Sequence, residues 1–376
     1  MWFLLKNGLR KNARVEGMKR WDIRVLPTSG EISTAIAEDH ALRYGGRMTN
    51  RHKVLVNRRV MDRRQAFYGA LTPPAFELVC VEDFEDTAHV AAVLKDVEFS
   101  FGVVPSEEWL EQTPNLRFIQ LGGVGYVEAG IRAAKDRGIP VALTPEGTCL
   151  GVAEHTILLI LALYKHLIQA HQALRDGKWI HNALRGISHF LYGKVLGVVG
   201  LGRIGTEVVH RTRGFLPERI VYTDLFRKTP EQEADLGVEY LALDDLLRMS
   251  DIVTLHVFLS DASRGMIGQR ELALMKPSAI LINTSRGAVV DEHALYHALR
   301  DGVIWGAGLD AWNEEPTAPD NPILKLDNVV CTPHMATGTI DADRMKFEAA
   351  IANFQRVLEG KEPLNVIERL YSEMGS

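Results

Sequence analysis

Charged and polar side chains follow several short apolar runs in the second half of the chain. Four of them carry a charge or can gain one: His256, Arg286, Asp310 and His334. Histidine suits proton transfer because its unperturbed pKa of about 6.5 lies near neutral pH. Arginine holds anions well because its guanidinium is planar and permanently charged. These residue types predict a site where one group moves a proton, another holds an anion and a carboxylate orients the base.

A glycine-rich turn precedes these residues. The mainly apolar run Lys194–Val199 is typical of a buried strand, and it leads directly into the sequence GLGRIG at residues 200–205. Residues 206–213 can continue as a helix, and a second strand at 220–223 is followed by Asp224. Strand, glycines, helix, strand and acid in this order are a strong signal for dinucleotide binding, whereas the glycines alone would fit an ordinary turn.

Each glycine of that turn meets a different structural requirement of dinucleotide binding. Gly200 permits the tight turn, Gly202 lets the backbone approach a pyrophosphate, and Gly205 lets the helix pack on the strand. The pyrophosphate would then lie on free N–H groups at the start of the helix. We expect Asp224 to bind the ribose hydroxyls and repel a 2′-phosphate, which favours NAD, although the basic pair at 227–228 could offset its charge.

The rest of the chain alternates short apolar runs with segments of helical length, which predicts βαβ units and parallel sheets. In the first half we expect strands at 53–57, 77–81, 97–104, 116–121 and 139–143, and helices at 61–71, 86–95, 106–112 and 128–137. In the second half we expect further strands at 252–255, 279–283, 306–309 and 328–331, and an amphipathic helix at 340–358. A single long helix at 151–175 should bridge the two sheets.

The carboxyl ends of parallel strands share one edge of a sheet, and ligands of open α/β folds bind at that edge. His256 and Asp310 directly follow the ends of two expected strands, and Arg286 and His334 each stand three residues after the end of another. We therefore expect these side chains to converge beside the turn at 200–205.

The composition is that of an ordinary globular protein with room for two domains. Of the 376 residues, 46% are hydrophobic and 24% are charged, and the net charge of −5 gives no reason to expect nucleic acid or a membrane as a partner. Cys80, Cys149 and Cys331 lack metal-ligand spacing, which predicts no metal site and favours a reducing, cytoplasmic location. Residues 1–50 are basic and lack a strand–helix rhythm, so we expect a poorly ordered or accessory extension, with an organelle presequence as the alternative.

From about Leu116 to Phe354 the chain resembles the D-isomer-specific 2-hydroxyacid dehydrogenases. Four motifs carry the resemblance: Val198–Gly205 is similar to the family's VGLGRIG, Ile282–Gly287 to INTSRG, Gly308–Pro316 to GLDVFxxEP, and Thr332–Met335 to TPHI. The loop Gly123-Val124-Gly125 resembles the family's substrate loop, and Gly151–Thr156 the start of its interdomain helix.

The resemblance implies an α/β fold of two Rossmann-like domains, in which a discontinuous, flavodoxin-like substrate domain (51–150 plus 335–376) flanks an NAD-binding domain (151–334). It implies a homodimer that transfers a hydride between nicotinamide and a D-2-hydroxy acid or 2-keto acid. His334 would be the general acid/base, Glu315 would orient it, and Arg286 would bind the carboxylate and carbonyl. Backbone N–H groups of Gly123, Val124 and Gly125 would bind the substrate carboxylate.

The same resemblance extends the cofactor site beyond the turn. Its expected members are Gly200, Gly202, Arg203, Ile204, Gly205, Asp224, His256, Val257, Thr284, Ser285, Arg286, Asp310 and His334. His256 is expected to support the cofactor loop rather than do chemistry. His155 is expected to be a surface or packed histidine of a helix, and Cys149 a packing residue without a paired base.

Two departures from the family pattern concern specificity. Phe258 stands where the family usually has proline in LHxP, and Val127 stands where it commonly has aspartate. Phosphoglycerate, glyoxylate and hydroxypyruvate therefore all remain open as substrates. The alternative of another class is a dinucleotide-sensing interaction protein, as in the related corepressors, but the intact Arg–Glu–His set favours an enzyme.

Overall fold

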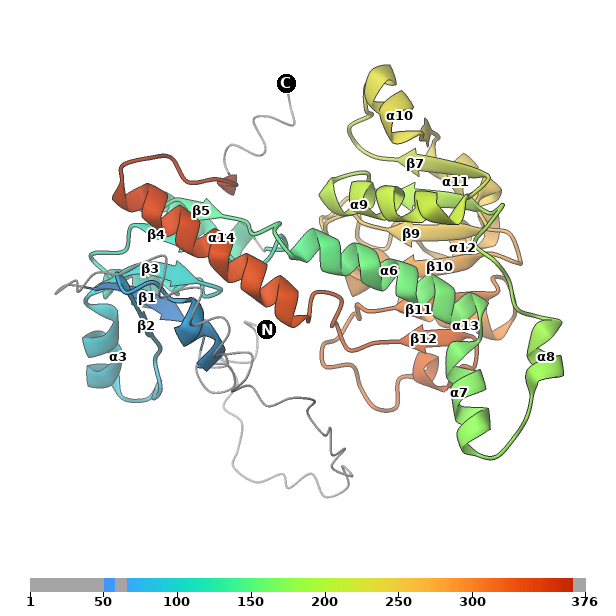
Figure 1. The fold of residues 1–376 in the computed structure, drawn as a ribbon, viewed down its shortest axis with the longest axis horizontal. Helices are drawn as coiled ribbons and strands as arrows, with labels where there is room; N and C mark the ends of the chain where they lie inside the picture. The colour runs from blue at the N-terminus through green and yellow to red at the C-terminus, as the bar shows by residue number, and fades with distance from the viewer. Residues whose placement is uncertain (1–50, 58–65, 127, 368–376) are drawn as a thin grey trace.

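The computed structural model describes residues 51–57, 66–126 and 128–367, which form two parallel sheets of five and seven strands. The expectations for residues 1–50, for residues 61–65 of the helix at 61–71, for Val127 and for residues 368–376 of the substrate domain lie outside these residues. The fold is the expected one, with two parallel-sheet α/β domains of the Rossmann type. In Figure 1 the sheets lie in separate lobes that α6 (Thr148–Tyr164) and α14 (Ile340–Leu358) connect.

The first sheet has the order β2-β1-β3-β4-β5, and all its strands are parallel. Buried side chains cover both of its faces, one of them including Phe347 and Phe354 of α14. Its strands are β1 (His52–Val56), β2 (Phe76–Val79), β3 (Val97–Phe101), β4 (Phe118–Gln120) and β5 (Val141–Ala142). Its other helices are α3 (Thr87–Leu94), α4 (Glu107–Glu111) and α5 (Glu128–Asp136).

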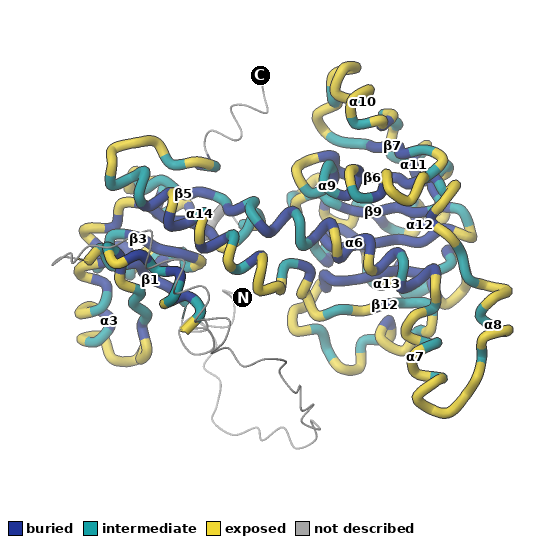
Figure 2. The backbone as a smooth tube through the Cα atoms, in the orientation of Figure 1, coloured by how far each residue is buried: buried dark blue, intermediate teal, exposed yellow. Residues whose placement is uncertain are grey.

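The second sheet has the order β12-β11-β10-β9-β6-β7-β8. Its strands are β6 (Val195–Val199), β7 (Arg219–Thr223), β8 (Glu239–Tyr240), β9 (Ile252–Leu255), β10 (Ile280–Asn283), β11 (Gly306–Leu309) and β12 (Val329–Cys331). Its helices are α8 (His181–Arg185), α9 (Arg203–Thr212), α10 (Pro230–Leu236), α11 (Leu243–Met249), α12 (Gln269–Leu274) and α13 (Glu292–Arg300). All five residues of β6 are buried, as expected for a parallel strand covered on both faces (Figure 2).

The ends of five neighbouring strands are in register across the second sheet. Val199 pairs with Leu255, Leu255 with Asn283, Asn283 with Leu309, and Leu309 with Cys331. The strand order reverses at β6, because the chain runs outward through β7 and β8 before it crosses to β9. The turn after β6 and the loop after β9 therefore border the position where open α/β sheets bind ligands.

The single helix expected at 151–175 is wrong, because the chain breaks it into two. α6 ends at Tyr164 and α7 (Leu167–Arg175) follows at an angle of 61°, with His166 between them in the left-handed region at φ 49°. Apolar residues continue on both sides of the break, so the pattern alone gives no sign of it. Among the described residues, no single helix is long and apolar enough to span a membrane, and only this bent pair passes such a test jointly.

Candidate active site

The residues that directly follow the aligned strand ends form the edge of the site. They are Gly200, His256, Thr284, Asp310 and Thr332. Arg286 comes two residues after Thr284, and His334 comes two residues after Thr332. The structure thus brings the expected residues of the second sheet to one edge, as the strand-end argument predicts.

His334 and Glu315 form a close pair at this edge. His334 Nδ1 lies 2.7 Å from Glu315 Oε2, and both side chains are about half exposed, at 46% and 39%. A carboxylate at this distance accepts the Nδ1 proton, which fixes the tautomer and leaves Nε2 for a reaction partner. His334 adopts a left-handed backbone conformation, with φ 50°.

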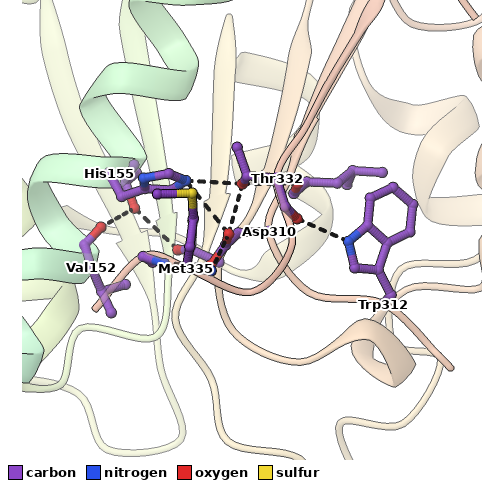
Figure 3. Close-up of polar contacts among 10 residues, drawn as sticks. Val152, His155, Asp310, Trp312, Thr332 and Met335 are labelled. Atoms are coloured by element: carbon purple, nitrogen blue, oxygen red, sulfur yellow. Dashed lines mark hydrogen bonds and ion pairs between the residues drawn. The ribbon is translucent and has the colours of Figure 1, made fainter. Parts of the chain in front are cut away.

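Trp312 bonds Glu315 and the segment just before His334, a role that the sequence pattern does not assign to it. Its backbone N–H donates to Glu315 Oε1 over 3.1 Å, and its indole Nε1 donates to the carbonyl oxygen of Thr332 over 3.0 Å (Figure 3). The family pattern has phenylalanine at this position, which lacks the indole donor. The motif itself was the available signal, since an indole N–H beside a catalytic segment usually finds a partner.

Asp310 is buried, with 1% of its surface exposed. Its carboxylate accepts hydrogen bonds from the segment that carries His334. It accepts from the Thr332 hydroxyl over 2.6 Å and from the backbone N–H groups of Met335 and Ala336 over 2.8 and 2.9 Å. The sequence predicts Asp310 as a cofactor residue. The contacts that the structure shows for it are with the protein, and they position the segment 332–336.

Arg286 lies in a loop that Asn283 shapes. The Asn283 side chain accepts from the N–H and hydroxyl of Ser285 and donates to the carbonyl of Arg286. One Arg286 guanidinium nitrogen donates to the Ser285 carbonyl over 2.8 Å. Burial lowers the pKa of Arg286, and the negative charge of Glu315 opposes that shift, so the two charged groups are close enough to interact.

Arg286 also reaches the loop of the first sheet. A Cβ atom at Gly125 would lie 1.6 Å from Arg286 Nη2, so the guanidinium packs directly on the backbone of Gly125. In the same loop, Gly123 accepts a hydrogen bond from the Thr144 N–H, and Val124 is half-buried. The expected substrate loop and the expected substrate-binding arginine therefore face each other across the two lobes.

The turn at 200–205 fits a dinucleotide. Gly200 has φ 93°, and a Cβ there would lie 2.8 Å from the His256 backbone. A Cβ on Gly205 would lie 2.2 Å from the Gly200 carbonyl oxygen, which is the close helix–strand packing expected for the third glycine. Beside Gly202, by contrast, a Cβ would meet nothing within 4 Å, and no side chain caps α9, so the start of the helix is open beside Gly202. An open helix N-terminus of this kind suits a pyrophosphate.

Asp224 stands at the end of β7 beside this turn. Its two carboxylate oxygens accept from the N–H groups of Leu201 and Phe226 over 2.6 and 3.1 Å. The nearby Arg227 makes two hydrogen bonds to Glu233 and lies 4.9 Å from the centre of the Tyr240 ring. Arg227 is therefore engaged away from Asp224, which limits its ability to offset the Asp224 charge.

His256 is half-buried beneath the loop after β9. Its Nε2 lies 2.9 Å from the Thr254 hydroxyl, its backbone N–H donates to Val199, and desolvation of the ring lowers its pKa to about 3. Nδ1 of His256 is buried without a hydrogen-bond partner. A neutral ring with one buried nitrogen agrees with support of the loop rather than proton transfer. Val257 packs beside Gly200, and Phe258 is 59% exposed.

The remaining expected residues lie around this core of the site. Arg203 and Ile204 begin α9, and the Arg203 guanidinium donates to the Asn365 side chain over 3.0 Å, across the two lobes. Cys149 is buried in α6, and burial raises its pKa to about 11, so its thiol stays protonated and unreactive at neutral pH. Within the described part of the chain, no three His, Cys, Asp or Glu side chains gather as a metal site.

Comparison with known proteins gives a consistent result. The family model described as D-isomer specific 2-hydroxyacid dehydrogenase, NAD binding domain, matches residues 157–336. The chain is 38% identical over 299 residues to a glyoxylate reductase of Korarchaeum cryptofilum, with 79% of this chain and 87% of that protein covered. It is 39% identical to a D-3-phosphoglycerate dehydrogenase of Methanocaldococcus jannaschii, with 71% of this chain but only 50% of that protein covered.

Solved structures agree over nearly the whole fold. A 2-hydroxyacid dehydrogenase of Ketogulonicigenium vulgare superposes with a TM-score of 0.73 at 29% identity, covering 85% of this chain and 99% of that one. An NADPH-dependent glyoxylate/hydroxypyruvate reductase of Sinorhizobium meliloti, in complex with NADP and malonate, gives 0.69 at 30% identity, covering 85% and 97%.

Proposed function

Because the chain belongs to the D-isomer-specific 2-hydroxyacid dehydrogenases, a family of NAD(P)-dependent oxidoreductases, we propose that it interconverts a small 2-keto acid and its D-2-hydroxy acid with NAD(H). The observation that carries the proposal is the 2.7 Å contact between His334 and Glu315, at the same sheet edge as Arg286 and the turn at 200–205. The catalytic residues are Arg286, Glu315 and His334.

The dinucleotide, when bound, supplies or accepts the hydride at its nicotinamide ring. In reduction, protonated His334 donates from Nε2 to the substrate oxygen, while Nδ1–H remains bonded to Glu315. The Glu315 carboxylate stabilises the positive imidazolium, so it favours the form that can donate. In oxidation, neutral His334 accepts the hydroxyl proton, and the same carboxylate stabilises the product of that step.

Arg286 and the Gly123–Gly125 loop bind the substrate. The guanidinium, already against Gly125, offers a charged fork to the carboxylate and polarises the carbonyl. Arg286 is half-buried, so water screens its charge less than that of an exposed arginine, and its attraction for an anion is correspondingly stronger. Free N–H groups of the loop would hold the other carboxylate oxygen.

The coenzyme binds along the edge of the second sheet. The turn Gly200–Gly205 with Arg203 and Ile204 holds the pyrophosphate, and Asp224 holds the adenosine ribose. The nicotinamide half of the coenzyme lies beside the loops that contain His256–Val257, Thr284–Arg286, Asp310 and His334. We favour NADH over NADPH because Asp224 is negatively charged and Arg227 is committed to Glu233.

We place the substrate domain at 51–150 plus 335–376 and the coenzyme domain at 151–334. We also propose that the protein is a cytoplasmic homodimer. No residue of α7 is buried, and three of its apolar side chains are exposed: Leu167, Ile168 and Leu174. A helix of nine residues is marginal in water without packing, so cover by a second copy would stabilise it. Sedimentation velocity should give twice the chain mass of 41.9 kDa, and a monomer at micromolar concentration would contradict the dimer.

Steady-state turnover with a panel of 2-keto acids tests the function. We expect glyoxylate and hydroxypyruvate to be reduced, since two relatives, covered over 87% and 80% of their lengths, are named for these substrates. NADH should support a higher kcat/KM than NADPH. Equal efficiency with both coenzymes would contradict the role given to Asp224. A protein that binds NADH but reduces no member of the panel would instead favour a dinucleotide-sensing interaction protein.

A further inference from the structure

The N-terminal half of α6 carries two consecutive polar residues that are buried against the catalytic loops. His155 is 8% exposed and Thr156 is fully buried, in a helix whose neighbouring residues are mostly apolar. Buried polar groups are costly unless they are hydrogen-bonded. Both residues bond to segments of the second sheet, and each of those segments leads within two residues to a catalytic side chain.

His155 begins a chain of hydrogen bonds that ends beside His334. Its Nε2 lies 2.9 Å from the Thr332 hydroxyl, which in turn donates to Asp310 over 2.6 Å (Figure 3). A hydroxyl has one hydrogen, so Thr332 must accept from His155, and His155 therefore carries its proton on Nε2. The same nitrogen lies 3.5 Å from Asp310 Oδ1, so it also faces the carboxylate charge directly.

This chain stabilises an unfavourable backbone conformation. His334 has φ 50°, a left-handed conformation that is unfavourable for a residue with a side chain and persists only where the surroundings hold it. Asp310 supplies that hold, because its carboxylate binds the N–H groups of Met335 and Ala336, directly after His334. His155 and Thr332 in turn orient the carboxylate.

Thr156 makes the corresponding contact to the Arg286 loop. Its hydroxyl donates to the Val152 carbonyl over 2.8 Å and lies 3.0 Å from the Thr284 hydroxyl, so Thr284 is the donor in that second bond. Thr284 stands two residues before Arg286. The two loops that carry the acid/base and the cation are thus anchored to adjacent residues of one helix.

We propose that His155 and Thr156 are positioning residues, and that α6 uses them to set His334 against Glu315 and Arg286 against the substrate loop. Neither touches substrate or coenzyme in this assignment. His155 acts through Thr332 and Asp310, and Thr156 acts through Thr284. The inference rests on the proposed function only in that it gives His334 and Arg286 their chemical roles.

The test compares His155→Leu, which removes the donor, with His155→Gln, whose side-chain amide reaches the position of Nε2. We expect His155→Leu to lower kcat for keto-acid reduction about 10- to 100-fold, the scale of a small misplacement of a reacting group, with NADH affinity unchanged. His155→Gln should recover most of the loss. His189→Leu is the matched control, because His189 packs against Tyr164 at the opposite end of α6.

A second readout does not need turnover. Diethyl pyrocarbonate modifies neutral imidazoles, and the half-exposed His334 should be accessible to it. Mass spectrometry against pH gives the midpoint at which His334 becomes reactive. A looser contact with Glu315 should move that midpoint to lower pH in both His155→Leu and Thr332→Val, because the carboxylate then stabilises the protonated ring less.

The results of these experiments distinguish the positioning role of His155 from the proposed dehydrogenase function. Combined with Glu315→Gln, His155→Leu should produce no further shift of the midpoint, because both changes act on one contact. A midpoint identical to wild type in His155→Leu and Thr332→Val, with only a lower melting temperature, would overturn the positioning role. Absence of keto-acid turnover in the wild type would instead overturn the proposed function, while the midpoint would still test His155.

Discussion

At the residue scale, the His334–Glu315 pair depends on neighbours that the sequence does not reveal. The types and spacing of Arg286, Glu315 and His334 predict their roles through the family motifs. The structure adds Trp312, which bonds both Glu315 and the segment before His334. Such contacts could not be predicted, because a side-chain donor in a loop can find many partners and only the folded backbone selects one.

His256 gives a prediction about acid stability. Its pKa is lowered to about 3 by burial, from an ordinary value of about 6.5. Between these values the unfolded chain binds a proton that the folded protein does not, so the folded state loses stability as pH falls below 6.5. The unfolded imidazole is already half protonated at pH 6.5, so at 1.36 kcal/mol per pKa unit His256 should contribute roughly 1.6 kcal/mol to the loss between pH 6.5 and 5.

Urea unfolding at the two pH values measures this effect. The difference in unfolding free energy should be smaller in His256→Leu than in the wild type by about that amount. His210→Leu, on an exposed position of α9, is the control and should leave the difference as it is in the wild type. Equal pH dependence in His256→Leu and the wild type would show that His256 can be protonated in the folded state.

At the element scale, the strands and their edge were predictable, whereas the helix break was not. Apolar runs located β6, β9, β10, β11 and β12 to within a residue or two, since buried parallel strands are continuously apolar. The bend at His166 follows no glycine or proline, so the sequence carries no breaker to mark it. Asp310 was found by the strand-end rule, but its contact with the Met335 N–H depends on how the chain folds back after β12.

Two glycine substitutions at the start of α9 should affect different properties, one coenzyme binding and the other the stability of the fold. Gly202→Ala should leave stability nearly unchanged, because the new Cβ meets nothing within 4 Å and the residue has an ordinary φ of −76°. It should weaken NADH binding about tenfold, since the methyl group occupies the space beside the free N–H groups. Gly205→Ala should instead cost about 1–3 kcal/mol of stability, because its Cβ would lie 2.2 Å from the Gly200 carbonyl oxygen.

Thermal unfolding and NADH fluorescence titration distinguish the two variants. Each serves as the control for the other, since both add one methyl group to the same turn. If Gly202→Ala bound NADH as tightly as the wild type, the pyrophosphate would not lie at this helix N-terminus.

At the scale of the whole molecule, neither sheet holds a complete site. Arg286 belongs to the second sheet but packs on Gly125, which follows β4 of the first. α6 and α14 join the lobes and pass close to each other, since a Cβ at Gly147 would lie 2.7 Å from Ala342. The relative position of the lobes therefore decides whether cation and substrate loop meet.

Gly125→Ala tests this junction. The added Cβ would stand 1.6 Å from Arg286 Nη2 and must displace the guanidinium. We expect KM for the keto acid to rise about tenfold or more while the dissociation constant for NADH stays the same. Gly122→Ala in the same loop is the control, because its Cβ would make only an ordinary 3.6 Å contact with Gly102. Equal KM values for the two variants would argue against a substrate site shared by the lobes.

The most direct test of the account is NADH oxidation by wild type and His334→Asn with the 2-keto acid that the panel identifies. The variant keeps a polar side chain but cannot exchange a proton near neutral pH. We expect a kcat about 10²–10⁴-fold lower in the variant, the usual contribution of a general acid/base, with the NADH dissociation constant unchanged. A His334→Asn protein that reduces the keto acid as fast as the wild type would contradict it.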